Sequence, residues 1–456
     1  MTKKTLLIVF LILSIFKGFA QPRLEGRLVI DMKTGQINCD FILSNLPEIT
    51  EYAILLNKGM NIKYFKDTKG SLINYDGFYD GIIKGEAVQY TFSDQGNTLP
   101  PTFKVTYSGS FPVYVGEYKA FDFKGVIAFN EQTLRATEQT KWYPVIYDIS
   151  NDRLIQDYTY DLKVEIINGN TVFVNGSAPK KGNRLHFESE KAWPLLLFAG
   201  SYDFLENHGD YILNTSITNE FANKIFQNID LIKNRLAQIM GKSFSDRIYL
   251  INHKALSKRK RRSSWGFNTY PSFAFSGLDF NGVVDEKGKF SMDNCKYFGH
   301  EFAHNYFGNN VNSGKLGWFW LESFAEYLSF NIVEDLYGED QLKQVLLSLI
   351  EYIQDDTFVP LDKIQKKEEV NEKYRYIVGP LLLQCFEDQF GRDRTNKVLQ
   401  NLLRYAETNT LSLPLWKESA LQSGISEIAF ESFQEQYVFH QDFKEHIMEE
   451  IVKKYN

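Results

Sequence analysis

The first half of the chain carries short apolar stretches that predict β-strands. They are rich in β-branched and aromatic residues, partly alternate with polar positions, and are separated by clusters of Asn, Asp and Gly. The predicted strands include Arg27–Asp31, Ile37–Ile42, Tyr52–Leu56, Val88–Phe92 and Thr102–Tyr107. Tyr158–Ile167 and Thr171–Val174, joined by Asn168-Gly-Asn170, predict a hairpin. We therefore expect an all-β domain over residues 21–200, built as a sandwich or a saddle-shaped sheet.

The periodicity changes near residue 200. Ser216–Met240 has apolar residues at helical spacing, and Gly241 suits the position after a helix. Arg247–Asn252 and Phe273–Phe280 predict strands, and a helix that begins near Ser291 is expected to end at Gly308. Further helices are predicted over Trp318–Leu336, Glu339–Gln354, Tyr376–Gln389, Asp393–Ala406 and a charged C-terminal segment. The whole chain predicts an α+β protein, with a mainly helical domain over residues 201–456.

The N-terminus has the layout of a signal peptide over residues 1–20. Lys3 and Lys4 precede the apolar run Thr5–Phe16, and small residues end at Ala20. The run is shorter than the ~20 residues of a membrane span, so cleavage after Ala20 is expected, with an uncleaved anchor as the alternative. No later segment is long and apolar enough to span a membrane. A secreted or periplasmic protein, with no stable membrane span after cleavage, is predicted.

Charge and cysteine content narrow the classes further. The formal net charge of −6 gives no basic field for nucleic acid. The basic run Lys258–Arg262 is interpreted as a solvated loop, and an acidic partner or a processing site are the alternatives. Three widely spaced cysteines do not predict a disulfide framework. Cys295 is expected to be a buried thiol.

The segment His300-Glu-Phe-Ala-His304 has the H-E-x-x-H pattern of zinc hydrolases. Residues four apart lie on one face of a helix, so both imidazoles can reach a single zinc ion. Glu301 lies beside that face, where its carboxylate can act as the general base toward a water molecule. The alternative is a polar helix face that carries two histidines by chance.

A catalytic zinc needs a third protein ligand and an open position. Glu322 and Glu326 lie four residues apart on one predicted helix, so one or both can face the metal. The spacing alone does not separate them, and both can also be ordinary surface residues.

Two segments resemble the gluzincin metallopeptidases of the aminopeptidase N family. His300-Glu-Phe-Ala-His-Asn-Tyr-Phe-Gly-Asn309 is similar to the family's H-E-x-x-H-x-W-F-G-N, and Trp320-Leu-Glu-Ser-Phe-Ala-Glu-Tyr327 to its W-L-N-E-G-F-A-x-Y. The resemblance implies a thermolysin-like catalytic domain, one catalytic Zn²⁺ ion and Glu322 as third ligand. The connecting loop is one residue shorter than usual, and Ser323 replaces a glycine, so this is a divergent member.

The same resemblance extends to substrate handling. Tyr376-Ile-Val-Gly-Pro-Leu-Leu-Leu383 is similar to the family's Y-x-K-G-A-x-x-L, whose tyrosine steadies the oxyanion, although Val378 replaces the lysine. Tyr374 is the alternative if the match slips by two residues. In place of the amine-binding G-A-M-E-N strand the chain has Ser276-Gly-Leu-Asp-Phe280. Asp279 is therefore the candidate to bind a substrate ammonium, or else an edge-strand or turn aspartate.

Together these features predict a secreted or periplasmic zinc metallopeptidase that acts on a peptide or protein substrate. The expected mechanism uses a zinc-activated water with Glu301 as general base and Tyr376 at the oxyanion. Aminopeptidase-like specificity is favoured, and an endopeptidase of the same fold is the alternative. A non-catalytic peptide-binding protein that retains the peptidase fold is the hypothesis from another class, motivated by the missing G-A-M-E-N strand.

Overall fold

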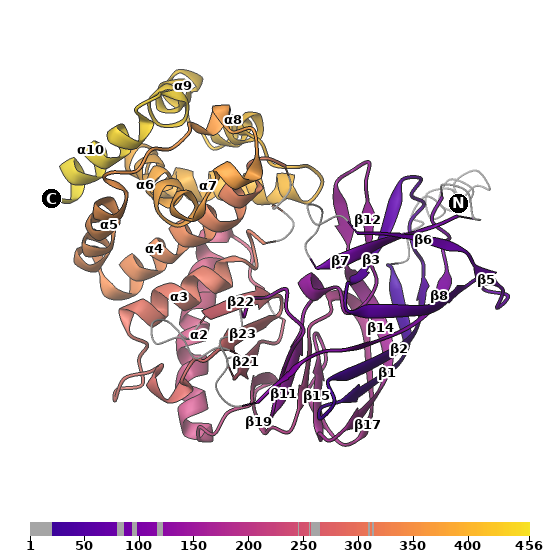
Figure 1. The fold of residues 1–456 in the computed structure, drawn as a ribbon. Helices are drawn as coiled ribbons and strands as arrows, with labels where there is room; N and C mark the ends of the chain where they lie inside the picture. The colour runs from indigo at the N-terminus through magenta and orange to yellow at the C-terminus, as the bar shows by residue number, and fades with distance from the viewer. Residues whose placement is uncertain are drawn as a thin grey trace, which may run out of the picture. The chain divides into compact units, whose positions relative to one another are not determined.

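A computed structural model describes residues 21–79, 86–93, 98–115, 122–244, 246–254, 256, 265–308, 311 and 314–456. The chain divides into two compact units (Figure 1). Unit 1 is Met1–Phe204 with His253–Trp265, and unit 2 is Leu205–Asn252 with Gly266–Asn456. The predicted signal peptide and the basic run Lys258–Arg262 lie outside the described residues. A β-rich part followed by a mainly helical part confirms the predicted fold class.

The described residues of unit 1 form three sheets. Their strands alternate apolar and polar residues, so each sheet can bury one face. The seven-stranded sheet has the order β17 (Arg184–Pro194), β14 (Asp157–Ile167), β1 (Arg23–Asp31), β2 (Gln36–Ser44), β8 (Phe103–Ser110), β4 (Met60–Lys66), β5 (Leu72–Ile73). The six-stranded sheet has the order β16 (Lys180–Lys181), β15 (Thr171–Val174), β18 (Leu197–Gly200), β11 (Thr133–Ala136), β10 (Ala128–Asn130), β9 (Val113–Tyr114). The five-stranded sheet has the order β13 (Arg153–Ile155), β12 (Val145–Asp148), β3 (Tyr52–Asn57), β7 (Ala87–Phe92), β6 (Tyr75–Phe78).

The predicted hairpin between β14 and β15 is wrong. β14 pairs with β1 in parallel and with β17, whereas β15 pairs with β16 and β18 in another sheet. Asn168 has a positive φ of 57°, as a tight turn requires, but the chain uses this turn to pass from one sheet to the next. Turn chemistry is local, and strand partners are chosen by long-range burial, so the turn signal misled the prediction.

Unit 2 begins on a five-stranded sheet with the order β19 (Phe204–Asn207), β20 (Asp210–Leu213), β21 (Tyr249–His253), β23 (Ser272–Ser276), β22 (Trp265–Thr269). The long helix α2 (Asn219–Met240) ends as predicted but begins three residues after Ser216, with Thr218 capping its start and Gly241 in the left-handed region after its end. The predicted strand Phe273–Phe280 is too long, because β23 ends at Ser276. A turn and the short helix η2 (Phe280–Gly282) follow.

The rest of unit 2 is helical, as predicted. The α-helices are α3 (Met292–Ala303), α4 (Phe324–Tyr337), α5 (Glu339–Ile353), α6 (Gly379–Phe390), α7 (Arg392–Ala406), α8 (Leu413–Gln422), α9 (Glu427–Gln434) and α10 (Phe443–Tyr455). Among the described residues, the 3-10 helices besides η2 include η1 (Glu138–Thr140), η5 (Leu361–Lys363) and η6 (Lys367–Glu369). Three π-helical turns are η4 (Phe319–Ser323), η7 (Tyr374–Val378) and η8 (Glu435–Phe439).

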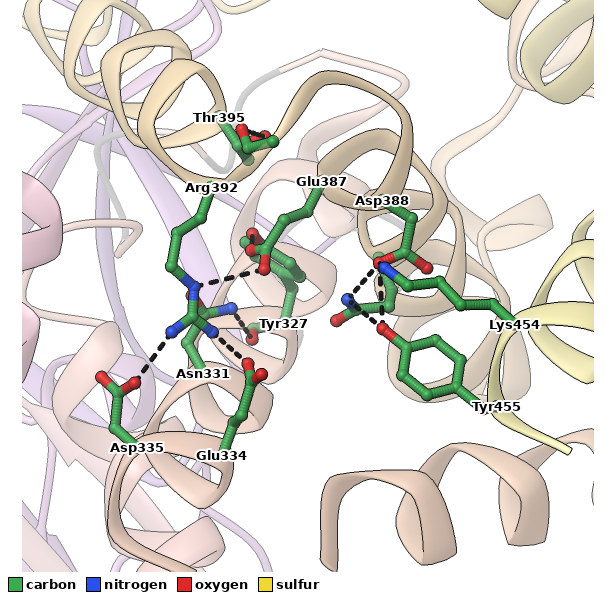
Figure 2. Close-up of polar contacts among 12 residues, drawn as sticks. Tyr327, Asn331, Glu334, Asp335, Glu387, Asp388, Arg392, Thr395, Lys454 and Tyr455 are labelled. Atoms are coloured by element: carbon green, nitrogen blue, oxygen red, sulfur yellow. Dashed lines mark hydrogen bonds and ion pairs between the residues drawn. The ribbon is translucent and has the colours of Figure 1, made fainter. Parts of the chain in front are cut away.

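A partly exposed ionic network joins three of these helices (Figure 2). Arg392, at the start of α7, donates to Asp335 at 2.8 Å and to Glu387 at 3.2 Å, and it also contacts Glu334. The Tyr327 hydroxyl donates to Glu387 from α4. One guanidinium thus holds α4 against α6 and α7, and α4 directly follows the segment that carries Glu322.

Two further expectations concern the described residues. Cys39, Cys295 and Cys385 are free and buried, and burial raises the pKa of the Cys295 thiol to about 12. The prediction of a buried Cys295 thiol is confirmed. Among the helices that the structure describes, none has the length and apolar character to cross a membrane.

Candidate metal centre

Three side chains converge where the sequence predicts a metal site. The Nε2 atoms of His300 and His304 are 3.2 Å apart, and Glu322 Oε2 lies 3.5 Å from each of them. His300 is buried, and His304 and Glu322 are half-buried. The ligand atoms of the three side chains lie within 4.8 Å of one another. Two imidazole nitrogens and a carboxylate oxygen at one point are a donor set that zinc prefers.

The spacing of these donors suits a tetrahedral ion. Ligand bonds of about 2.0–2.1 Å place two ligands of a tetrahedral zinc about 3.3 Å apart. The three measured separations, 3.2, 3.5 and 3.5 Å, lie close to this value. His300, His304 and Glu322 therefore fit the ion, and a fourth position is left for a small ligand.

Helix α3 presents the two histidines on one face. Its start is fixed by Ser291, whose side chain accepts from the Asn294 amide. The helix ends at Ala303, five residues before the predicted end at Gly308, and His304 occupies the position after the last helical residue. His304 keeps helical dihedrals (φ −63°, ψ −11°), so the four-residue spacing still stacks the rings, with centroids 4.8 Å apart.

The outer nitrogens of both rings are held by different groups. His300 Nδ1 lies 2.9 Å from Glu326 Oε2, and His304 Nδ1 lies 3.0 Å from the carbonyl oxygen of Phe307. Each acceptor makes Nδ1 the protonated nitrogen and leaves the lone pair of Nε2 facing the shared point. The two glutamates that spacing could not separate thus lie on opposite sides of His300, with Glu322 at Nε2 and Glu326 at Nδ1.

The site concentrates negative charge around the imidazoles. Burial lowers the pKa of His300, but Glu322, Glu326 and Glu301 outweigh it and raise that pKa to about 10. Burial alone would raise the pKa of Glu322, yet the charges and hydrogen bonds of His304 and His300 bring it well below the usual range. Carboxylates that stabilise a protonated imidazole in this way are equally suited to a divalent cation.

Glu301 is buried at the same site. The Asn268 amide donates to the backbone oxygen of Glu301 at 3.0 Å, which ties strand β22 to helix α3. The charge of Glu301 contributes to the raised pKa of His300 and of Tyr376, although for Tyr376 burial is the larger cause. The carboxylate therefore shares one electrostatic environment with the candidate ligands.

The two candidate tyrosines point in different directions. The Tyr376 ring lies 5.7 Å from that of His300, and burial followed by the charge and hydrogen bond of Glu322 raises the pKa of its hydroxyl. Tyr374 is fully buried against Phe443 and Phe358, and its hydroxyl has no partner among the described residues. Tyr376 is thus the tyrosine at the metal centre.

Two π-helical turns shape this centre, and sequence reasoning missed both. Glu322 lies on η4 and Tyr376 on η7, each placed directly before an α-helix. Gly379, which follows η7 and begins α6, faces η4, and an added Cβ there would lie 2.1 Å from Ser323 Oγ. The serine that replaces the usual glycine at 323 is thus accommodated by a glycine on the facing element. π-helical turns have no simple sequence signal and occur often at functional sites.

Asp279 is not on a strand. It is exposed and caps η2, where its Oδ1 accepts from the backbone amide and the side-chain amide of Asn281, both at 3.0 Å. The described sheet instead has β22 as an edge strand, and β22 contacts α3 through Asn268. The sheet order, which sequence spacing does not reveal, places this edge beside Glu301.

Comparisons with known proteins agree with this geometry. Residues 287–437 match the peptidase family M1 domain. Native yeast LTA4 hydrolase has a TM-score of 0.62 at 12% identity, over 93% of this chain and 68% of that one. The M1 zinc metallopeptidase of Deinococcus radiodurans has a TM-score of 0.62 at 12% identity, and the match covers 92% of this chain and 93% of that one. A variant of that peptidase bound to a Tyr-Ser-Ala substrate has a TM-score of 0.60 at 12% identity, and the match covers 92% of this chain and 94% of that one. No curated protein matches the chain.

Proposed function

We propose that this chain is a zinc peptidase, which hydrolyses peptide bonds at a zinc centre formed by His300, His304 and Glu322. The match of residues 287–437 to the peptidase family M1 domain supports the proposal. The observation that carries the proposal is the convergence of two Nε2 atoms and one Oε2 atom at separations of 3.2–3.5 Å. Three protein ligands are the usual number for a catalytic zinc, whereas a structural zinc usually has four.

The residues around the ligands supply the remaining chemistry. Bound zinc would provide a Lewis acid and lower the pKa of water at the site. Glu301 takes a proton from the attacking water and passes it to the leaving amine. Its burial beside the ligands supports this role, because a carboxylate shielded from bulk water keeps the proton within the site.

Tyr376 is proposed to stabilise the oxyanion. Its hydroxyl is near Glu322 and its ring contacts His300, so it lies at the edge of the same centre. Burial and the neighbouring carboxylates raise its pKa, so the hydroxyl keeps its proton at neutral pH and can donate to developing negative charge.

The substrate is proposed to be a peptide, cleaved in an aminopeptidase-like manner. One structure of the same fold holds a Tyr-Ser-Ala substrate. An extended peptide can lie along β22, the edge strand that Asn268 ties to Glu301. Asp279 remains the predicted partner of the substrate ammonium. Full activity of an Asp279→Asn variant on peptides with a free N-terminus would exclude this role. We also propose that the protein is secreted or periplasmic, which N-terminal sequencing of the mature chain tests.

The experiment compares wild type with Glu301→Gln. Zinc content is measured by elemental analysis, and hydrolysis is assayed on amino-acyl amides and on N-blocked peptides. We expect one zinc per chain in both proteins and at least a ~10³-fold lower kcat in the variant. If the protein hydrolysed only N-blocked peptides and no amino-acyl amides, it would be an endopeptidase and not an aminopeptidase. Stoichiometric zinc without hydrolysis of any peptide would favour the non-catalytic binding protein.

A further inference from the structure

We propose that Lys296 is a positioning residue for the metal ligand His300, and that it acts through Glu326. The inference rests on the proposed function only in taking the bound ion to be zinc. It assigns a role to a lysine that lies one helical turn before His300 and does not contact the metal position.

The three side chains form a continuous chain of contacts. Glu326 Oε2 lies 2.9 Å from His300 Nδ1, and Glu326 Oε1 contacts Lys296 Nζ. The lysine and the histidine lie four residues apart on α3, whereas Glu326 lies on α4. Each oxygen of one carboxylate thus has its own partner, and both partners lie on the same face of the neighbouring helix.

This arrangement fixes the plane of the carboxylate. A carboxylate held at one oxygen rotates about its terminal bond, whereas one held at both oxygens has a single orientation. The backbone of Glu326 is also restrained, because the Ser329 hydroxyl donates to its carbonyl oxygen at 2.6 Å. Lys296 therefore keeps Oε2 directed at Nδ1, and so holds the imidazole with Nε2 toward the metal.

Burial makes the lysine necessary. Glu326 is only 6% exposed, and the Glu322 and Glu301 carboxylates lie in the same cluster. A buried carboxylate among other carboxylates is unfavourable unless a cation is adjacent. The Lys296 side chain is 23% exposed, and its ammonium also lies 5.5 Å from the centre of the Phe330 ring, so it is packed in place.

Among the described residues, the second ligand has no equivalent support. His304 Nδ1 is held by the uncharged carbonyl of Phe307, which the backbone itself keeps in place. By contrast, the outer nitrogen of His300 is held by a movable side chain, Glu326, which is paired with the Lys296 ammonium. Loss of Lys296 is therefore expected to weaken zinc binding through His300 alone.

Three possible roles of Lys296 predict different signs. If the ammonium acted only as a nearby positive charge, its removal would strengthen zinc binding by reducing repulsion. If it served only to stabilise the fold, its removal would leave the affinity of the folded protein unchanged. A positioning role predicts weaker binding, by about 10-fold, in the range found for the outer partners of metal-ligating histidines.

The test measures zinc affinity of the intact chain by competition with a chromophoric chelator. The proteins are wild type, Lys296→Met, Lys296→Arg, Glu326→Gln and the double variant Lys296→Met/Glu326→Gln. Lys453→Met is the matched control, because this substitution removes the same charge elsewhere in the unit. Lys453 is 77% exposed and is a partner of Glu450. Circular dichroism of the zinc-free proteins identifies the variants that are folded, and only those are compared.

We expect Lys296→Met to weaken zinc binding about 10-fold, Lys296→Arg to stay within about 3-fold of wild type, and Lys453→Met to match wild type. The double variant should bind no more weakly than Glu326→Gln alone, because Lys296 acts through that carboxylate. Unchanged or tighter binding by folded Lys296→Met overturns this inference and leaves the proposed function standing. Failure of wild type itself to bind zinc overturns both. If Lys296→Met does not fold, the double variant decides, because zinc binding tighter than that of Glu326→Gln alone would mean that the ammonium acts only as a nearby charge and would overturn the inference.

Discussion

The two units bury charged side chains in different ways. In unit 1, Arg135 is fully buried, donates to Asp122 at 2.8 Å and to the Phe123 carbonyl at 3.0 Å, and stacks on Trp265 at 4.8 Å. In unit 2, the groups around α3 are buried or half-buried and include two imidazoles and three glutamates, with Lys296 at one edge. In unit 1 the buried arginine is paired with one aspartate. In unit 2 imidazole and carboxylate groups are gathered around the candidate metal position.

The difference separates a structural from a chemical use of buried charge. A buried ion pair with opposite charges in contact is closed, because neither partner has capacity for a third ion. Acceptors directed at one point from α3 and η4 keep their attraction for a cation, and the same charges raise the pKa of His300 and lower that of Glu322. Perturbed titration alone does not mark a site, whereas converging lone pairs do. The following predictions test this contrast, from the largest expected effect to the smallest.

Replacement of Glu322 by Ala should abolish the site. We expect zinc content to fall from one per chain to near zero and peptide hydrolysis to fall at least ~10³-fold, because one of three ligands is lost. Glu431→Ala is the control, since Glu431 is an exposed partner of Lys417 in the same unit. Elemental analysis and peptide assays give the result, and full zinc content in the variant would contradict the ligand assignment.

Replacement of Tyr376 by Phe should lower kcat ~10²–10³-fold with KM changed less than about 2-fold, because the hydroxyl acts only on the developing oxyanion. Tyr374→Phe is a close control, since that ring is in the apolar core. Steady-state kinetics on one peptide substrate distinguishes the two. Equal kcat values for both variants would remove Tyr376 from the catalytic set.

Replacement of Arg135 by Met should destabilise unit 1 and spare the zinc site. Removing one partner of a buried ion pair leaves Asp122 uncompensated, at a cost of about 3–5 kcal/mol. Chemical denaturation measures the loss, and elemental analysis should still find one zinc in the folded variant. A folded Arg135→Met protein that has lost its zinc would break the contrast between the units.

Replacement of Gly379 by Ala should strain the contact between η4 and the start of α6. The new Cβ would lie 2.1 Å from Ser323 Oγ, and overpacking of this kind costs about 1–3 kcal/mol. Adding Ser323→Gly should recover most of that loss, because it removes the clashing atom. Thermal unfolding of the two variants and the pair measures the coupling, and additive effects would show that Ser323 and Gly379 do not meet.

The stability of the zinc-free protein should depend on pH through the same cluster. The pKa of His300 is raised to about 10 from about 6.5, so its contribution is fully present below pH 6.5 and is lost as pH rises through 10. The pKa of Glu326 is lowered to about 2, because Lys296 and His300 outweigh the opposing effect of burial, and its contribution is lost only as pH falls through about 4.5 to 2.

From pH 6.5 to 9.5 the free energy of unfolding should therefore fall, by up to ~1.4 kcal/mol per pH unit from this group. Urea unfolding in the presence of a chelator measures the slope for wild type and His300→Asn. The variant should show a shallower slope, and parallel curves would mean that His300 is not protonated in the metal-free fold.

The sequence alone determined the features that depend on neighbouring residues. Apolar periodicity gave the β-rich and helical parts and the end of α2, because side-chain direction in a helix or strand is set locally. The four-residue spacing of His300 and His304 placed both rings on one face even though α3 ends early. The resemblance of two motifs to the M1 gluzincins is confirmed by the family match at residues 287–437.

The tertiary structure decided what depends on distant residues. It placed Glu322 at Nε2 and Glu326 at Nδ1 of His300, and Tyr376 rather than Tyr374 beside that ring, because α3, η4 and η7 come together only in the folded chain. It also placed β15 outside the predicted hairpin and Asp279 in a turn. Lys296 gained a role only through α4, which lies thirty residues further along the chain at Glu326. Such contacts are selected by packing across the core, which a local pattern does not encode.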